Sequence, residues 1–86
     1  MSKLTFRTPL TKKQNSDLKG DLTDLISERL REIRRSKDMT QQELSEAAGL
    51  HLTYVGHLEA GKYHPSVFVL WKIARTLDVS LDDLVS

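Results

Sequence analysis

Apolar positions recur with the period of a helix from about residue 21 onwards. The first set falls at spacings of three and four residues and comprises Leu22, Ile26, Leu30 and Ile33. This spacing places the four side chains on one face of a helix. Asp21 is the predicted N-cap, with Thr23 as the alternative, and the helix is expected to end near Lys37, where Asp38 takes a left-handed conformation.

Four shorter helices are predicted after this one, each with a start or stop signal. Capping boxes at residues 40–43 and 80–83 open the second and the last helix, and Ser66 caps the fourth, which runs to Leu77. The third spans about residues 52–60, and glycines at 49 and 61 end the second and third. The side chains expected to face inward are Leu44, Ala47, Ala48, Val55, Leu58, Val67, Leu70, Ile73, Ala74, Leu77, Leu81 and Leu84.

The second and third predicted helices are joined by a turn too short for an antiparallel pair. They must therefore cross steeply, which leaves the third helix protruding, as in a helix-turn-helix. The crossing requires a positive φ at Gly49 and a small side chain at Ser45, where the two helices touch. The predicted fold is all-α, a five-helix orthogonal bundle with a helix-turn-helix and a short N-terminal arm.

Charge divides the chain into an arm and a body. Residues 1–21 hold five basic and two acidic side chains, a net charge of +3, whereas residues 22–86 carry a net charge of −2. We therefore expect a basic N-terminal arm over residues 1–21 and a helix-turn-helix domain over residues 22–86. The arm allows a short strand from Leu4 to Thr8, ended by Pro9. It is interpreted as a solvated tail, a DNA backbone contact or a strand that pairs across a dimer.

Composition excludes several classes of protein. The 86 residues suit one small domain, and the absence of cysteine excludes disulfides, cysteine zinc sites and thiol nucleophiles. His51, His57 and His64, even with Glu59, do not converge as metal ligands, and no nucleophile elbow or phosphate loop occurs. The expected protein is a non-enzymatic, cytoplasmic one, with no metal, cofactor, membrane or small-molecule ligand.

Residues 26–84, about seventy percent of the chain, resemble the phage lambda repressor/Cro-like helix-turn-helix transcription regulators. The motifs that carry the resemblance are Arg31-Glu32-Ile33-Arg34, Thr40-Gln41-Gln42-Glu43-Leu44, Ala48-Gly49-Leu50, Tyr54-Val55, Leu58-Glu59-Ala60-Gly61-Lys62, Pro65-Ser66, and Ile73-Ala74 with Leu77. Within this family, Gly49-Leu50-His51 followed by Thr53-Tyr54 is similar to the small controller proteins of restriction-modification systems.

The resemblance implies that the ligand is duplex DNA and that the third helix reads it. The implied base-reading residues are His51, Leu52, Thr53, Gly56 and His57. Thr53 can exchange hydrogen bonds with a base edge, and His57 can donate to a purine N7, but Leu52 offers only apolar contact and Gly56 none. Since no Arg, Gln or Asn stands on this face, we expect modest direct readout supplemented by DNA shape.

Phosphate contacts are expected at both ends of the helix-turn-helix. The candidates are Thr40, Gln41, Tyr54, Lys62, Tyr63 and His64. For Tyr54, core packing with an exposed hydroxyl is an equal alternative. Arg34 and Glu59 are interpreted through the family pattern as a structural ion pair that ties the first helix to the third.

One short recognition helix buries little surface, so pairing on two half-sites is expected. The predicted dimer interface comprises Phe68, Val69, Trp71, Leu81, Leu84 and Val85. Alternatively, Phe68 and Trp71 close the bottom of the core. The predicted function is a sequence-specific transcription regulator, a homodimer on a pseudo-palindromic operator. The alternative is an antitoxin-like or controller protein that holds a partner protein through the same patch or through the arm.

Overall fold

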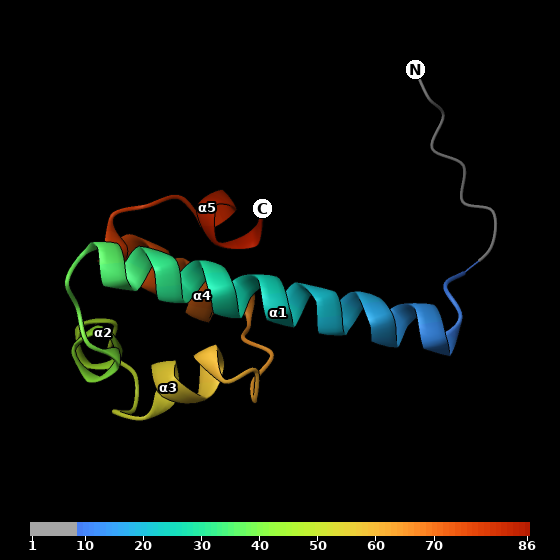
Figure 1. The fold of residues 1–86 in the computed structure, drawn as a ribbon, viewed down its shortest axis with the longest axis horizontal. Helices are drawn as coiled ribbons and strands as arrows, with labels where there is room; N and C mark the ends of the chain where they lie inside the picture. The colour runs from blue at the N-terminus through green and yellow to red at the C-terminus, as the bar shows by residue number, and fades with distance from the viewer. Residues whose placement is uncertain (1–8) are drawn as a thin grey trace, which may run out of the picture.

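A computed structural model describes residues 9–86 of the chain, and this part is built of helices alone (Figure 1). The helices are α1 (Lys12–Ser36), α2 (Gln41–Ala47), α3 (Tyr54–Glu59), α4 (Val67–Leu77) and α5 (Leu81–Val85). This confirms the predicted all-α class with five helices. The strand expected over residues 4–8 lies outside the described residues.

Helix α1 begins about ten residues earlier than the sequence pattern predicts. Its N-cap is Thr11, whose hydroxyl accepts a hydrogen bond from the Gln14 amide at 3.0 Å while Gln14 Oε1 accepts from Thr11 N–H at 3.0 Å. The predicted starts at Asp21 and Thr23 are therefore wrong, and the expected boundary between residues 21 and 22 falls inside α1. Periodicity missed this stretch because residues 12–22 are all exposed and so have no buried face to reveal.

The core lies between the second half of α1 and the other four helices. It comprises Ile26, Leu30, Leu44, Ala48, Val55, Leu58, Leu70, Ile73, Ala74, Leu77 and Leu84. Three residues predicted to face inward are exposed instead: Leu22, Ala47 and Val67. Leu22 and Val67 lie on the flanks of their helices, at the mouth of an apolar groove rather than in the core.

The turn between α2 and α3 has the predicted geometry. Gly49 adopts φ +71°, and the Leu50 N–H donates to the Ser45 carbonyl at 2.8 Å. Ser45 is fully buried, and its hydroxyl accepts from the Val55 N–H at 3.0 Å while donating to the Gln41 carbonyl at 2.9 Å. Ser45 is thus small enough for close packing and also satisfies an amide in the first turn of α3.

Side chains of α1 satisfy the carbonyls at the end of α3. The hydroxyl of Ser27 shares its one proton between the Thr23 carbonyl at 2.8 Å and the Leu58 carbonyl at 3.0 Å, and Arg31 Nη2 donates to the Glu59 carbonyl at 3.1 Å. Because the last carbonyls of a helix have no partner within it, these bonds fix α3 to α1. None of the helices in residues 9–86 combines the length and apolar character needed to cross a bilayer.

Candidate nucleic-acid interface

The exposed side of the helix-turn-helix forms a shallow groove of about 370 Å³. It is lined by Gln41, Gln42, Leu52, Thr53, Gly56, His57, Ala60 and Lys62. The groove thus brings together four of the five predicted base-reading residues with two of the predicted phosphate contacts. Helix α3 is shorter than the predicted span of about 52–60, because Leu52 and Thr53 lie in the turn that precedes it.

His51 lies beside this groove and organises the turn. Its Nδ1 accepts from the Thr53 N–H at 3.2 Å and lies 3.0 Å from Thr53 Oγ1. An Nδ1 that accepts from an amide carries no proton, so the neutral ring holds its proton on Nε2. Both side chains are exposed, which leaves that Nε2–H as a donor directed away from the turn.

Gln41 lies across α3 in a space that Gly56 leaves open. A Cβ placed on Gly56 would lie 3.0 Å from Gln41 Oε1, a separation that forces the amide to move. Gln41 Nε2 donates to Glu59 Oε1 at 3.0 Å, which holds the nitrogen end of its amide while Oε1 faces Gly56. Gly56 therefore positions Gln41, a role that the sequence pattern does not reveal.

Glu59 is the anchor of this arrangement. Its carboxylate accepts from Arg34 Nε at 2.6 Å and from Arg34 Nη2 at 3.0 Å, and Arg31 Nε lies 3.6 Å away. Arg34 and Glu59 are only 7% and 3% exposed. Arg34 also donates to the Met39 carbonyl at 2.8 Å, which ties in the chain between α1 and α2. A two-point pair of this kind fixes orientation as well as distance.

The pKa of the Glu59 carboxyl reflects two opposed effects. Burial raises its pKa, but hydrogen bonds from Arg34 and Gln41 together with the charges of Arg34 and Arg31 outweigh burial, and the pKa is lowered. The same hydrogen bond raises the pKa of the Arg34 guanidinium against the effect of its burial. Both groups are therefore charged at neutral pH.

An aromatic cluster closes one end of the groove. The Tyr63 ring lies 5.0 Å from that of Tyr54 and 5.4 Å from that of His57. Tyr54 is half-buried and packs against the core, and burial, followed by the nearby Tyr63, raises the pKa of its phenol. Tyr54 thus combines core packing with a place beside the groove, and both interpretations offered for it remain compatible with its position.

Two predicted phosphate contacts have other partners. His64 is turned toward α1, where its Nδ1 lies 2.9 Å from Thr23 Oγ1, outside the groove. Since that hydroxyl donates to the Lys19 carbonyl at 2.8 Å, it accepts from His64 Nδ1–H. Thr40 caps α2, with its hydroxyl accepting from the Glu43 N–H at 3.0 Å. Its hydroxyl proton stays available to a ligand.

The predicted dimer residues divide into exposed and buried members. Phe68 and Trp71 are 63% and 47% exposed, so the alternative that they close the core is wrong. Val69, Leu81 and Val85 are half-buried. Leu84 must be corrected, because it is completely buried in the core and presents no surface to a partner in this structure.

Two cationic side chains lie over the exposed aromatic rings of α4. The rings of Phe68 and Trp71 are stacked with centroids 6.4 Å apart. Lys72 Nζ lies 5.3 Å from the Phe68 centroid, and Arg75 lies over Trp71 at 5.0 Å.

Within residues 9–86, no three of the His, Asp and Glu side chains gather as a metal site would require.

The sequence model of the helix-turn-helix family matches residues 30–84. The chain belongs to this family, in its lambda repressor/Cro-like form. It is 41% identical over 56 residues to an uncharacterised helix-turn-helix transcriptional regulator of Archaeoglobus fulgidus, covering 65% of this chain and 80% of that protein.

Two solved structures share its fold. The hypothetical transcription factor NHTF from Neisseria is similar with a TM-score of 0.75 and 28% identity, over 98% of this chain and 90% of that one. The restriction-modification controller protein C.AhdI from Aeromonas hydrophila is similar with a TM-score of 0.70 and 34% identity, over 72% of this chain and 94% of that one. The resemblance to controller proteins noted in the sequence thus extends to structure.

The lowered pKa of Glu59 predicts how stability depends on acidity. A carboxyl whose pKa is lower in the folded than in the unfolded state stabilises the fold fully above the unfolded value of about 4.3. That contribution is lost as the pH falls through the lower, folded-state pKa. We expect the contribution of Glu59 to the free energy of unfolding to be constant from about pH 7 to 5 and to decrease below about pH 4. Urea titrations at several pH values measure it.

The variant Glu59→Gln isolates this contribution. It should be less stable at pH 7, because Arg34 is then buried without its counter-charge, and its stability should fall less steeply between about pH 5 and 3. Glu32→Gln, at an exposed carboxylate of α1, is the matched control and should leave the wild-type acid profile unchanged. An identical acid profile for Glu59→Gln and the wild type would contradict the ionised pair.

Proposed function

We propose that the chain is a sequence-specific transcription regulator that binds double-stranded DNA as a homodimer, with α3 in the major groove of a pseudo-palindromic operator. The observation that carries this proposal is the groove itself, where base-reading and phosphate-binding candidates converge on the exposed side of a helix whose inner face is buried. Family membership supports the same ligand.

The roles of the side chains follow from their chemistry and position. Thr53 and His57 face base edges, and the free Nε2–H of His51 donates to a base or a phosphate. Gln41, at the start of α2, and Lys62 contact phosphates on either side of α3. With one threonine and two histidines as polar readers, DNA shape must supply part of the specificity.

The short length of the recognition helix favours dimerisation. Helix α3 has six residues and is therefore about 9 Å long, which spans only a few base pairs. Two copies on half-sites about 34 Å apart double the contacts, as helix-turn-helix dimers do. The exposed Phe68 and Trp71 on α4 offer apolar surface for that association.

The similarity to C.AhdI favours a controller-type regulator, and control of its own promoter is the specific form of regulation that we propose. That protein is a restriction-modification controller, and this chain spans almost its full length. On this basis we propose that the operator lies in the DNA just upstream of the protein's own gene.

The test is a fluorescence-anisotropy titration against that upstream duplex, with a shuffled duplex as control, at several salt concentrations. We expect a preference of about 10³ or more for the native duplex and an affinity that falls steeply as salt rises. Weak and equal affinities for both duplexes would contradict a specific regulator of this promoter and would favour an antitoxin-like, partner-binding role.

Substitutions at the reading face sharpen this test. Thr53→Ala and His57→Ala should each reduce the preference for the native duplex by about tenfold or more, while changing the free energy of unfolding by less than about 1 kcal/mol. Thr76→Ala, which does not line the groove, should leave the preference unchanged. Unfolding by either reading-face substitution would show that α3 is wrongly oriented.

Gly56→Ala is predicted to separate stability from binding. Alanine favours a helix by about 1 kcal/mol over glycine, but its Cβ forces the Gln41 amide to give by a few tenths of an ångström. We expect unchanged or slightly higher stability together with an operator affinity reduced about fivefold or more, because the phosphate contact of Gln41 is misaligned.

A double-mutant cycle with Gln41→Ala tests whether the effect passes through Gln41. The affinity of the double variant should match that of Gln41→Ala alone, since the same contact is removed only once. Losses that add fully would instead indicate a direct clash between the new methyl group and DNA.

A further inference from the structure

The N-terminal half of α1 buries no side chain within the part of the chain that the structure describes, residues 9–86. Residues 12–22 are all exposed, and this half extends beyond the other helices (Figure 1). A helix of this length in water depends on packing, because its own hydrogen bonds barely offset the lost chain entropy.

Beyond the capping box of Thr11 and Gln14, the local sequence gives this half of the helix little support. The first turn carries Lys12 and Lys13 and no acidic residue, the reverse of what the helix dipole favours. Gly20 lies in the interior, where glycine is unfavourable, and nothing lies within 4 Å of a Cβ added there. The ion pair between Lys13 and Asp17 is 3.4 Å long and exposed, so it stabilises little. Contacts with another molecule would therefore stabilise this half of α1.

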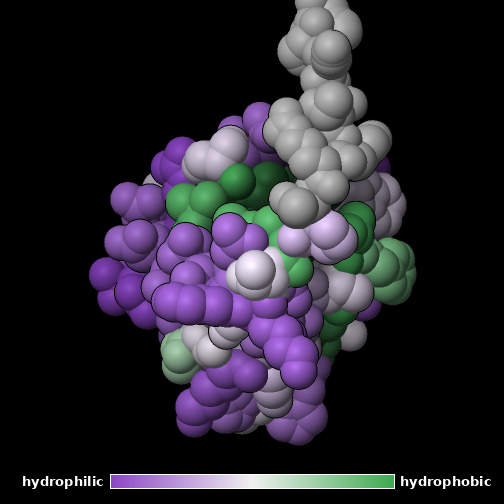
Figure 2. Space-filling model, turned by 90° about the vertical axis from the view of Figure 1, so that its right-hand side faces the viewer, coloured by the Kyte–Doolittle hydropathy of each residue, from purple (hydrophilic) through white to green (hydrophobic). Residues whose placement is uncertain are grey.

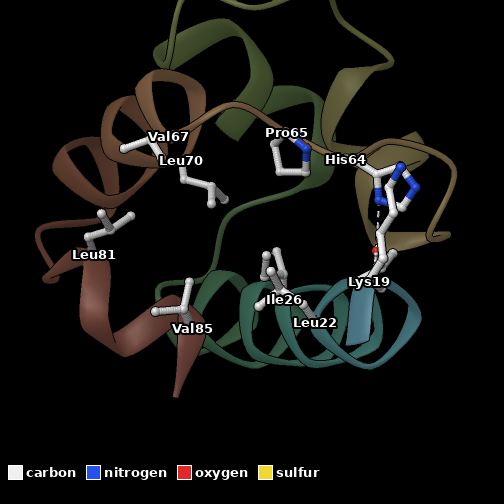
Figure 3. Close-up of a pocket in the computed structure, with 10 residues that line it drawn as sticks. Lys19, Leu22, Ile26, His64, Pro65, Val67, Leu70, Leu81 and Val85 are labelled. Atoms are coloured by element: carbon white, nitrogen blue, oxygen red, sulfur yellow. Dashed lines mark hydrogen bonds between the residues drawn. The ribbon is translucent and has the colours of Figure 1, made fainter. Parts of the chain in front are cut away.

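An apolar groove of about 530 Å³ begins where this half of α1 meets the rest of the domain. Figure 3 shows its walls, with Leu22 and Ile26 from α1, Val67 and Leu70 from α4, and Leu81 and Val85 from α5. In Figure 2, which looks at the molecule from the end where α1 begins, hydrophobic residues gather around a hollow on this side.

Apolar residues continue the groove on both sides. Leu18 precedes Leu22 by one helical turn and is 54% exposed. Trp71 follows Val67 by one turn on α4 and stacks on Phe68, so that the hollow lies between two exposed apolar ridges. A contiguous exposed patch of this kind marks an interaction surface.

The charges beside the groove identify a second copy as the occupant. Three lysines, Lys12, Lys13 and Lys19, outnumber Asp17 and Asp21 on this half of α1, whereas Asp82 and Asp83 lie in the first turn of α5. A two-fold axis would bring the basic helix of each copy against the acidic α5 of the other, twice in one interface. A surface that carries both a ridge and a hollow, and both signs of charge, is complementary to itself.

We propose that the N-terminal half of α1 is an intermolecular element of the dimer, packing through Leu18 and Leu22 against the α4–α5 surface of a second copy. This inference rests on the proposed homodimer and extends it, because it adds a segment on α1 to an interface expected on α4 and α5 alone. In Figure 1, α5 and α3 lie on opposite sides of α1, so this contact leaves the recognition helix uncovered.

The test measures dimer dissociation by sedimentation equilibrium in the full chain. The variant Leu18→Lys/Leu22→Lys should raise the dimer Kd by about 100-fold, because two lysines replace buried leucines in each copy. Both leucines are exposed in one chain, so the variant should keep its fold and its affinity for a duplex carrying a single half-site. The matched control Ser16→Lys lies about 200° around the helix from Leu18 and should leave the Kd within about threefold.

Gly20→Ala tests the same idea in the opposite direction. It touches nothing in one chain, yet it favours the helix that dimerisation uses, so the dimer Kd should fall about fivefold or more. Circular dichroism should show helicity that rises with protein concentration in the wild type and less so in Leu18→Lys/Leu22→Lys.

Two results would overturn the inference. They differ in whether the proposed homodimer survives. A dimer that survives Leu18→Lys/Leu22→Lys but dissociates in Phe68→Ala/Trp71→Ala would exclude α1 from the interface and keep the homodimeric regulator. A wild type that stays monomeric at tens of micromolar, a concentration far above that of typical specific DNA binding, would overturn both the contact and the homodimer. Failure of the wild type to bind any half-site would instead count against the proposed function.

Discussion

One buried carboxylate holds the helix-turn-helix of this protein together. Glu59 ends α3, pairs with Arg34 of α1 through two hydrogen bonds and accepts a third from Gln41 of α2. Burying two charges is costly unless each is fully paired, so the three helices must meet in one arrangement for the pair to be tolerated. The ion pair thus fixes the angle at which α3 protrudes and the place of the Gln41 amide.

Much of this was predictable from the sequence because the signals are local. The capping boxes that begin α2 and α5 and the positive φ of Gly49 all follow from residues within a few positions of one another. The first half of α1 was not predictable from periodicity, since a helix that buries nothing in its own chain shows no apolar period. The role of Gly56 was also hidden, because it depends on Gln41, fifteen residues away.

The site residues also divide into those placed by local geometry and those whose surroundings come from distant parts of the chain. The base-reading candidates gather in one groove because the helix-turn-helix geometry alone places them. Leu84 was misjudged because the core, built from distant segments, covers it, and the contact of His64 with Thr23 of α1 was hidden for the same reason. The result is a molecule with two separate surfaces, a polar groove on α2 and α3 and an apolar groove between α1, α4 and α5.

Backbone amide shifts in an NMR titration with the upstream duplex test most directly whether DNA binds the polar groove and not the apolar one. Binding through the polar groove predicts the largest shifts at Gln41, Gln42, Thr53, His57 and Lys62, and little change at Leu18, Leu22, Phe68, Trp71 and Val85 if the free protein is already a dimer. Large shifts confined to the second set, with the first set unmoved, would contradict the account, because DNA would then bind the surface assigned to the second copy.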